Sequence, residues 1–255
     1  MANTRNIALN VLLKIENEGA YSNIALNNAI KENRLSGVDS SFVSALVYGV
    51  LERRITLDYI IRSYSKIPLR KIETKTKNIL RLGILQLLFM DKVPDSAAVN
   101  ESVNLAKKHK LQKSSGFING ILRNITRAED KYTLPDEKDR ARYLSVKYSV
   151  PENIVKLWVN SYGENNTEQL LASLNGRAKI CCRVNTLRTD ADTLIKKLSD
   201  EGVVAEKIPF IDNALYLENT GSVERLRAYM SGHFHIQDAS SQLCVNFRGE
   251  KPRSI

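Results

Sequence analysis

The pattern that most constrains the fold is a helical spacing of apolar residues, which runs almost without interruption from Thr4 to Arg127. Near the start, Ile7, Val11 and Ile15 recur every four positions and so share one face of a helix. The segment "TKTKNILRLGILQLLFMD" is apolar nearly all round in its second half. A helix of that kind is surrounded by others, so we expect it at the centre of a helical bundle.

Boundary signals divide this half into separate helices. A second helix is expected to begin near Ser22, a residue favoured at helix N-termini. A single long helix is predicted from about Ser41 to Tyr64 and should end before Pro68. The pair Asn119-Gly120 is typical of a tight hairpin turn, but apolar residues keep helical spacing on both sides of it. We therefore predict a helix there rather than a turn.

The character of the sequence changes at Leu134. Two further helices are expected, and beyond Gly176 short strands are predicted in "KICCRVNTL", "VVAEKIP" and "ALYLE", around the helix "ADTLIKKLSDEG". The fold class is thus a mainly α helical bundle followed by a small α+β domain. We expect three regions: a helical domain over residues 1–130, linker helices and the α+β domain over 131–232, and the start of another domain over 233–255.

The net charge of +10 is distributed unevenly. Lys and Arg number 20 through Asp130, against 12 Asp and Glu, whereas the remainder holds 18 against 16. A basic excess in one half indicates a polyanionic partner, most often a nucleic acid. The alternative is a solvated basic surface without a partner.

Several segments of the chain are similar to a known family in order and spacing. These are "YSNIAL", "LVYGVLERR", "IPLRKI", "ILRLGILQLLFMDKVPDSAAVNESVNLAKK" and "SSGFINGILRNI", followed by "LSVKYSVPENIVKLWVNSYG", "CCRVNTLRTDADTLIKKL" and "GHFHIQDASSQL". The chain resembles the RsmB (Sun/Fmu) family of bacterial 16S rRNA cytosine-C5 methyltransferases from about Asn6 to Leu243. The resemblance implies a NusB-like RNA-binding domain, then a small domain similar to an RNA-recognition fold, and small-subunit rRNA as partner.

The resemblance also implies a catalytic domain after "QDASSQL", with a DxCAAPGGK-like segment that binds S-adenosylmethionine and two later cysteines. Neither pattern follows Leu243 in this sequence. Attack on C5 of a pyrimidine requires a thiolate of lowered pKa, and Cys181 and Cys182 lie in an apolar strand pattern. We therefore expect a truncated chain that is inactive alone, with no catalytic, cofactor-binding or metal-binding residues.

Two basic clusters in the helical half are the candidate RNA contacts, because cations on loops and helix ends suit phosphate binding. Their residues are Arg62, Lys66, Arg70, Lys71, Lys75, Lys77 and Arg81 in the first cluster, and Lys107, Lys108 and Lys110 in the second. The alternative for the first is a solvated face. The second lies at a helix C-terminus, where cations also stabilise the helix dipole.

The second half offers weaker candidates. Arg183 and Asn185 alternate with Cys182 along one strand, but no aromatic residue accompanies them there for stacking on bases. Asp238 precedes a predicted helix and is expected to cap it, although the resemblance would place it beside a substrate cleft.

Three functions compete. The leading one is the RNA-binding front portion of an rRNA methyltransferase, the second is a free-standing NusB-like transcription antitermination factor, and the third is a protein-interaction module. No apolar stretch is long enough to span a membrane, and the N-terminus lacks the pattern of a signal peptide. We therefore expect a cytoplasmic protein without a membrane or metal partner.

Overall fold

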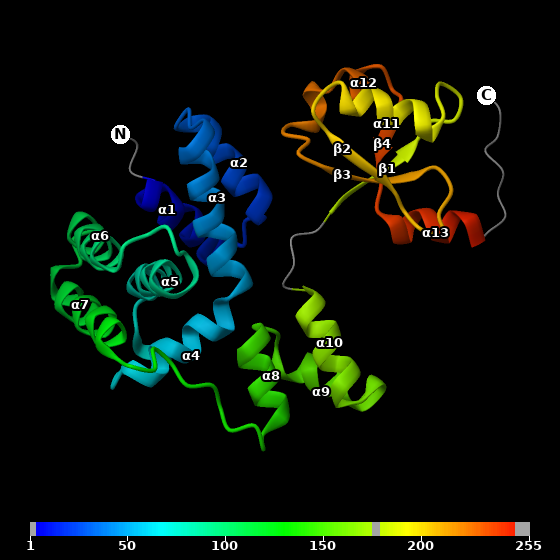
Figure 1. Ribbon diagram of the computed structural model, residues 1–255. Coiled ribbons are helices and arrows are strands. Elements are labelled where there is room, and N and C mark those ends of the chain that lie inside the picture. The colour runs from blue at the N-terminus through cyan, green and yellow to red at the C-terminus, as the bar shows by residue number, and fades with distance from the viewer. Residues whose placement is uncertain (1–3, 175–178, 248–255) are drawn as a thin grey trace. The chain divides into compact units, whose positions relative to one another are not determined.

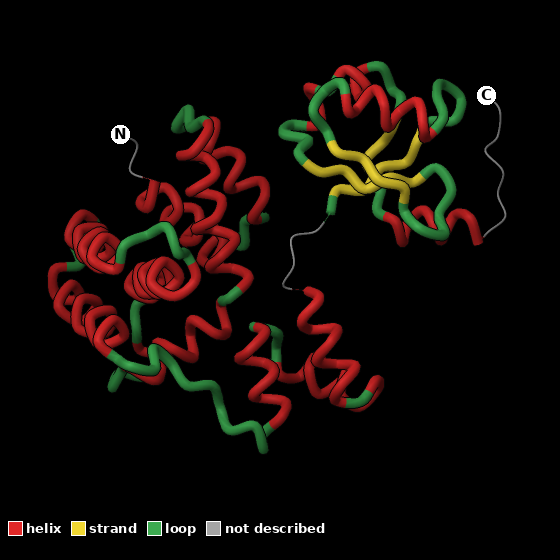
Figure 2. The backbone as a smooth tube through the Cα atoms, viewed as in Figure 1, coloured by secondary structure: helices red, strands yellow, loops and turns green. Residues whose placement is uncertain are grey.

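The computed structural model describes residues 4–174 and 179–247. The chain forms two compact units, residues 1–175 and 176–255. Figures 1 and 2 show that the first is built from helices and that the second contains the sheet. The mainly helical half and the α+β half expected from the sequence are both confirmed.

The elements of the first unit follow one another with short connections, except for the longer segment 128–139 between α7 and α8. They are α1 (Thr4–Glu18), α2 (Ser22–Glu32), α3 (Gly37–Glu52), α4 (Arg54–Tyr64), the short 3-10 helix η1 (Leu69–Lys71), α5 (Thr74–Phe89), α6 (Asp95–Lys108), α7 (Gln112–Arg127), α8 (Arg140–Tyr148), α9 (Glu152–Tyr162) and α10 (Glu164–Leu174).

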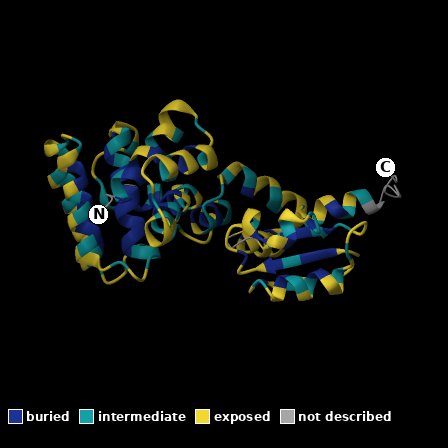
Figure 3. Cartoon of the chain, turned by 90° about the horizontal axis from the view of Figure 1, so that it is seen from above, coloured by how far each residue is buried: buried dark blue, intermediate teal, exposed yellow. Residues whose placement is uncertain are grey.

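Helix α5 is the centre of the bundle, as its apolar sequence predicts. It packs against α1, α3, α4, α6 and α7, and residues 78–87 are all buried. Gly83 lets α6 and α7 approach, because a Cβ atom there would lie 2.8 Å from both Leu122 Cδ1 and Ser102 Oγ. Figure 3 shows buried residues gathered inside the helical bundle. The apolar all-round pattern therefore identified the core helix correctly.

The single long helix predicted from Ser41 to Tyr64 is wrong. The chain breaks at Arg53 (φ −104°, ψ 17°), which separates α3 from α4. The backbone N–H of Ile55 at the start of α4 donates to Ser149 Oγ (3.0 Å) rather than within a continuing helix. Thr56 Oγ1 donates to the carbonyl of Val146 (2.5 Å). The partners lie about ninety residues away in the sequence, so local periodicity could not reveal the break.

Helices α8, α9 and α10 form a small cluster of their own within the first unit. Its buried residues are Tyr143, Leu144, Val155 and Leu171. Helix α8 also packs on α4. Glu168 on α10 pairs with both Arg140 and Lys147 of α8, which fixes the two helices to each other.

The second unit has the order of elements of a ferredoxin-like domain. They are β1 (Ile180–Val184), α11 (Ala191–Ser199), β2 (Val204–Lys207), β3 (Ala214–Glu218), the 3-10 helix η2 (Val223–Arg225), α12 (Arg227–Met230), β4 (Phe234–Ile236) and α13 (Ala239–Phe247). All neighbouring strands are antiparallel, in the order β2-β3-β1-β4. This is the β-α-β-β-α-β arrangement of the ferredoxin-like fold.

Helices cover both faces of this sheet. Cys182, Leu194 and Phe234 belong to the core on the side of α11 and α12. Cys181, on the opposite face, packs with Ala239 and Leu243 of α13. Figure 1 shows α13 on one side of the strands and α11 on the other. The sheet therefore exposes no wide open face on which a row of bases could stack.

The boundary between the two compact units follows residue 175, whereas the predicted domains end near residues 130 and 232. Helices α8–α10 belong to the first unit, and β4 at residues 234–236 is hydrogen-bonded to β1. The three regions proposed from the sequence stay predictions about independent folding. Residues 248–255 lie outside the described residues.

Candidate nucleic-acid interface

The first basic cluster surrounds an open pocket of about 610 Å³ between α4 and α5. Its lining residues are Arg62, Ser65, Lys66, Ile67, Pro68, Leu69, Arg70 and Lys77. The connection is held by local hydrogen bonds: Ile67 N donates to Ser65 Oγ (3.0 Å), and Lys71 N to Pro68 O (2.8 Å). Four predicted RNA contacts are thus brought around one hollow by a turn with a fixed backbone.

Three of these cations are exposed and have no acidic partner among the residues that the structure describes. Within the described part of the chain, no carboxylate forms an ion pair with Arg62, Lys66 or Arg70, and Lys71 on η1 is equally unpaired. The Arg62 Nε donates to the Asp58 backbone carbonyl (3.3 Å). Their charges are therefore available to an anion from solution, and two guanidinium groups can each hold a phosphate through two hydrogen bonds.

Arg81 was predicted as an RNA contact, but it lies in the interior of the helical bundle. Its side chain is only 4% exposed, and its Nε and Nη2 donate to Asp58 Oδ1 (2.7 Å) and Oδ2 (2.9 Å). The Nη1 donates to Glu16 Oε2 (2.8 Å). Burial alone would lower the pKa of Arg81, but the hydrogen bonds and charges of Asp58 and Glu16 outweigh it and raise the pKa. Arg81 is a buried structural cation and cannot reach an RNA phosphate.

Lys77 joins the buried network to the pocket. Its Nζ lies 3.5 Å from Glu16 Oε1, and its side chain also lines the hollow. Burial would raise the pKa of Glu16, but the hydrogen bond from Asn78 and the charges of Arg81 and Lys77 lower it. Lys77 is therefore partly neutralised and is a weaker candidate than the three unpaired cations.

The two basic clusters approach each other at His109, which follows α6. Burial lowers the pKa of His109, and the charges of Lys75 and Lys108 lower it further, so both lysines lie near the ring. The His109 Nε2 lies 2.6 Å from Asn6 Oδ1. Lys75 acts on His109 together with Lys108 and is not among the residues that line the pocket between α4 and α5.

The remaining predicted RNA contacts, Lys107 and Lys110, do not line the α4–α5 pocket. Lys107 lines a separate groove of about 510 Å³ between α6 and α7, together with Asn100, Asn119 and Arg123. Lys110 is exposed beyond the end of α6 and has a positive φ of 59°. The predicted set is thus spread over three surfaces and the interior.

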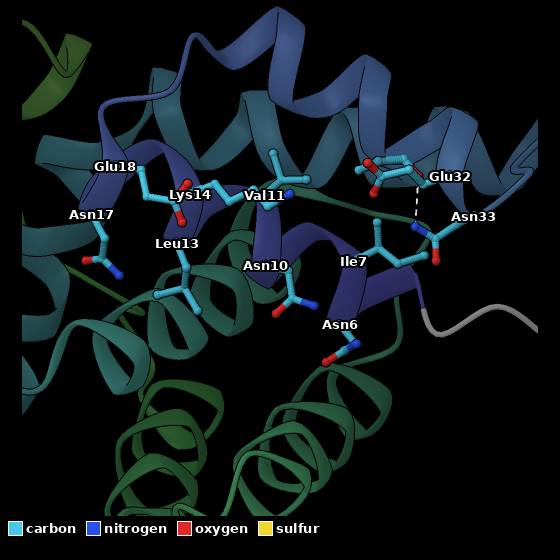
Figure 4. Close-up of a pocket in the computed structure, with 11 residues that line it drawn as sticks. Asn6, Ile7, Asn10, Val11, Leu13, Lys14, Asn17, Glu18, Glu32 and Asn33 are labelled. Atoms are coloured by element: carbon cyan, nitrogen blue, oxygen red, sulfur yellow. Dashed lines mark hydrogen bonds between the residues drawn. The ribbon is translucent and has the colours of Figure 1, made fainter.

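A polar pocket between α1 and α2 was not predicted. It has a volume of about 360 Å³, and Figure 4 shows Asn6, Asn10 and Asn17 along α1 at its edge. These residues and Lys14 recur at helical spacing opposite the buried face of α1. The repeated asparagines on one face of α1 could have indicated this pocket in the sequence. They were not predicted as a site because uncharged amides do not indicate a particular ligand.

The weaker candidates of the second unit have structural roles. Asp238 Oδ1 accepts from the N–H of Ser240 (2.8 Å), so Asp238 caps the start of α13, as expected. Asn185 Nδ2 donates to Gly232 O (2.8 Å) and ties two loops together. Burial raises the pKa of the Cys182 thiol to about 12, which keeps it protonated and a poor nucleophile at neutral pH.

Residues 4–174 and 179–247 were searched for membrane spans and metal sites. No helix among them is both long and apolar enough to cross a bilayer. The same residues hold no group of three or more His, Cys, Asp or Glu side chains placed to bind a metal ion.

Comparison with known proteins identifies both units. Residues 2–127 match the NusB family, and residues 150–224 match the ferredoxin-like domain of RsmF/B-like methyltransferases. A relative in Bacillus subtilis (strain 168), a "Probable ribosomal RNA small subunit methyltransferase B", is 34% identical over 98% of this chain and 55% of its own length. A Synechocystis relative of the same description is 32% identical over 99% and 56%.

The crystal structure of PH0851 is similar in fold, with a TM-score of 0.68 at 17% identity over 98% of this chain and 56% of that one. The chain therefore spans little more than half the length of these relatives. The chain thus contains a domain of the NusB family over residues 2–127, followed by a ferredoxin-like domain of the RsmF/B-like methyltransferase type over residues 150–224.

Proposed function

We propose that this chain is the RNA-binding portion of a small-subunit (16S) rRNA cytosine-C5 methyltransferase and that it binds structured rRNA through the pocket between α4 and α5. The observation that carries the proposal is the hollow lined by Arg62, Lys66 and Arg70, whose cations lack acidic partners among the described residues. The descriptions of the Bacillus and Synechocystis relatives name the same rRNA subunit. The S-adenosylmethionine dependence and the cytoplasmic location expected of such an enzyme belong to the same proposal.

The pocket suits phosphates rather than bases. Its polar groups are cations on long side chains, and its apolar lining comes from Ile67, Pro68 and Leu69. Cations of this kind position a nucleic acid and gain affinity mainly by releasing counterions, without reading sequence. Sequence or structure selectivity must therefore come from elsewhere in the chain.

A free-standing antitermination factor is less well supported. The match to the ferredoxin-like domain and the relatives' alignment over nearly the whole chain both extend well beyond the NusB-family domain. These two findings favour the methyltransferase assignment.

The test replaces Arg62, Lys66 and Arg70 with Ala and measures binding of a 16S rRNA fragment at several salt concentrations. Each lost phosphate contact reduces the slope of log K against log salt by about 0.7 to 0.9, so we expect the slope to flatten by about 2. Circular dichroism should show unchanged helix content, because the three side chains are exposed.

A matched control removes three other exposed charges of the same domain, Lys31, Arg34 and Lys92, which also form no ion pair with a carboxylate of residues 4–174 or 179–247. The control should lose little affinity and keep the wild-type slope. Equal losses in both variants would show that only the overall charge matters and would refute the pocket as an RNA site.

A further inference from the structure

Phe210 occupies an unfavourable backbone position in the loop between β2 and β3. The loop begins with a turn in which Ile211 N donates to Ile208 O (3.4 Å), with Pro209 second and Phe210 third. The φ of Phe210 is +67°. Glycine or asparagine normally takes the third place of a turn with this geometry, because a bulky side chain is strained at positive φ.

Packing does not compensate for this strain. The Phe210 side chain is fully exposed, at 101% of its reference area. Its neighbours Ile208 and Ile211 are each only 6% exposed and pack with Cys181 and Ala214 on the α13 side of the sheet. The two isoleucines therefore hold the turn in place while the phenyl ring projects into solvent. Folding gains nothing from this ring, so its presence calls for a binding role.

An arginine and a histidine lie at the same end of the sheet. Arg183 on β1 is opposite Ala214, the first residue after the loop, and is paired on its other side with His235 on β4. Val184 N donates to Asn213 O (2.8 Å), which fixes the end of the loop against β1. Among residues 179–247, no carboxylate forms an ion pair with Arg183.

We propose that Phe210 stacks on an unpaired base of RNA and that Arg183 and His235 contact the adjoining backbone. This inference rests on the proposed function as an RNA-binding protein and adds a second contact in the other unit. Base stacking on an aromatic ring needs only one flat face and tolerates any base. A protein partner would require a contiguous surface several times larger than one ring, and the adjacent isoleucines are buried.

The aromatic residues on the strands are not free for stacking: Tyr216 on β3 is half-buried against the Cys181 cluster with Lys179 Nζ 5.1 Å from its ring centroid, and Phe234 on β4 is fully buried. Because α13 covers the face of the sheet that contains Cys181, bases cannot lie along that face. An aromatic residue at the rim of the sheet remains accessible. The fully exposed ring of Phe210 is thus carried by a loop rather than by a strand.

The experiment uses the full chain and two RNA probes, a single-stranded oligonucleotide that contains 2-aminopurine and a blunt duplex of the same sequence. For Phe210→Asn, we expect about tenfold weaker binding of the single strand and loss of 2-aminopurine quenching, with unchanged binding of the duplex. The midpoint of thermal unfolding should stay the same or rise, because asparagine tolerates positive φ.

Two controls separate stacking from a general loss of surface. Phe210→Tyr should keep both affinity and quenching. Leu187→Asn, which removes an apolar side chain that is 81% exposed in the β1–α11 loop at the same sheet end, should also behave as wild type. Wild-type binding and quenching by Phe210→Asn, or an equal loss on the duplex, would overturn the proposal.

The same probes distinguish failure of this inference from failure of the proposed function. The variant without Arg62, Lys66 and Arg70 should show a flatter salt dependence but retain quenching at saturating protein. If that variant behaves as wild type while Phe210→Asn loses quenching, the pocket proposal fails and the stacking site stands. The reverse result refutes the stacking site alone.

Discussion

Replacing Arg81 with Met should destabilise the protein strongly without altering its RNA contacts. Arg81 holds the carboxylates of Asp58 and Glu16, whose side chains are only 14% and 24% exposed. Removing the guanidinium leaves two poorly hydrated negative charges facing an apolar side chain. Breaking a buried ion pair by removing one partner costs about 3–5 kcal/mol, and the partial exposure of Glu16 favours about 3.

The assays are urea unfolding, which gives the free energy of unfolding, and thermal unfolding, which gives Tm. Both are followed by circular dichroism. A loss of about 3 kcal/mol corresponds to a fall in Tm of roughly 6–12 °C for a chain of this size. Arg81→Lys keeps the charge but cannot donate two parallel hydrogen bonds to Asp58, so it should lose less than the Met variant.

The pH dependence supplies a second readout. The folded-state pKa of Glu16 is below its ordinary value, so its pairing stabilises the protein above the ordinary glutamate pKa of about 4.3 and ceases to do so as pH falls through the lowered pKa. The stability gap between wild type and Arg81→Met should therefore narrow under acid conditions, because protonation removes the unpaired charge in the variant.

Two results would refute this reasoning. A loss below about 1 kcal/mol would mean that solvent screens the network as it screens a surface ion pair. A flatter salt dependence of rRNA binding in a fully folded Arg81→Met variant would mean that Arg81 contacts phosphate after all.

Four further predictions concern packing, domain boundaries, cofactor binding and thiol reactivity. Gly83→Ala should cost about 1–3 kcal/mol in urea unfolding, because its Cβ would lie 2.8 Å from Leu122 Cδ1, whereas Gly116→Ala, with nothing within 4 Å, should be neutral or stabilising. Residues 1–130 alone should unfold cooperatively in a thermal melt but with lower stability, because Ile55 N and Thr56 Oγ1 lose their partners on α8 and its C-terminal end. A non-cooperative melt would contradict that domain boundary. Isothermal titration of the chain with S-adenosylmethionine should give no binding heat, and a thiol reagent should modify the exposed Cys244 while native Cys182 stays unreactive.

Much of the fold could be predicted from the sequence because its signals are local. Helical spacing around Asn119-Gly120 outweighed the turn preference of that pair, and α7 runs through it from Gln112 to Arg127. Alternation in the second half located the strands, and Cys181 and Cys182 point to opposite faces of the sheet. The basic character of the segment that forms the α4–α5 pocket was visible as well.

Only the tertiary structure decided which charged residues are available for binding. In the sequence, Arg62, Lys66 and Arg81 are three basic residues of one cluster, with nothing to distinguish them. In the fold, Asp58 and Glu16 approach Arg81 from two other helices and pair with it in the core. The break at Arg53 likewise depends on Ser149 and Val146, far along the chain. The sequence by itself determined the helices, the strands and the basic excess, because these depend on neighbouring residues. Which charges are paired and which remain free depends on contacts between distant segments, which exist only after the chain has folded.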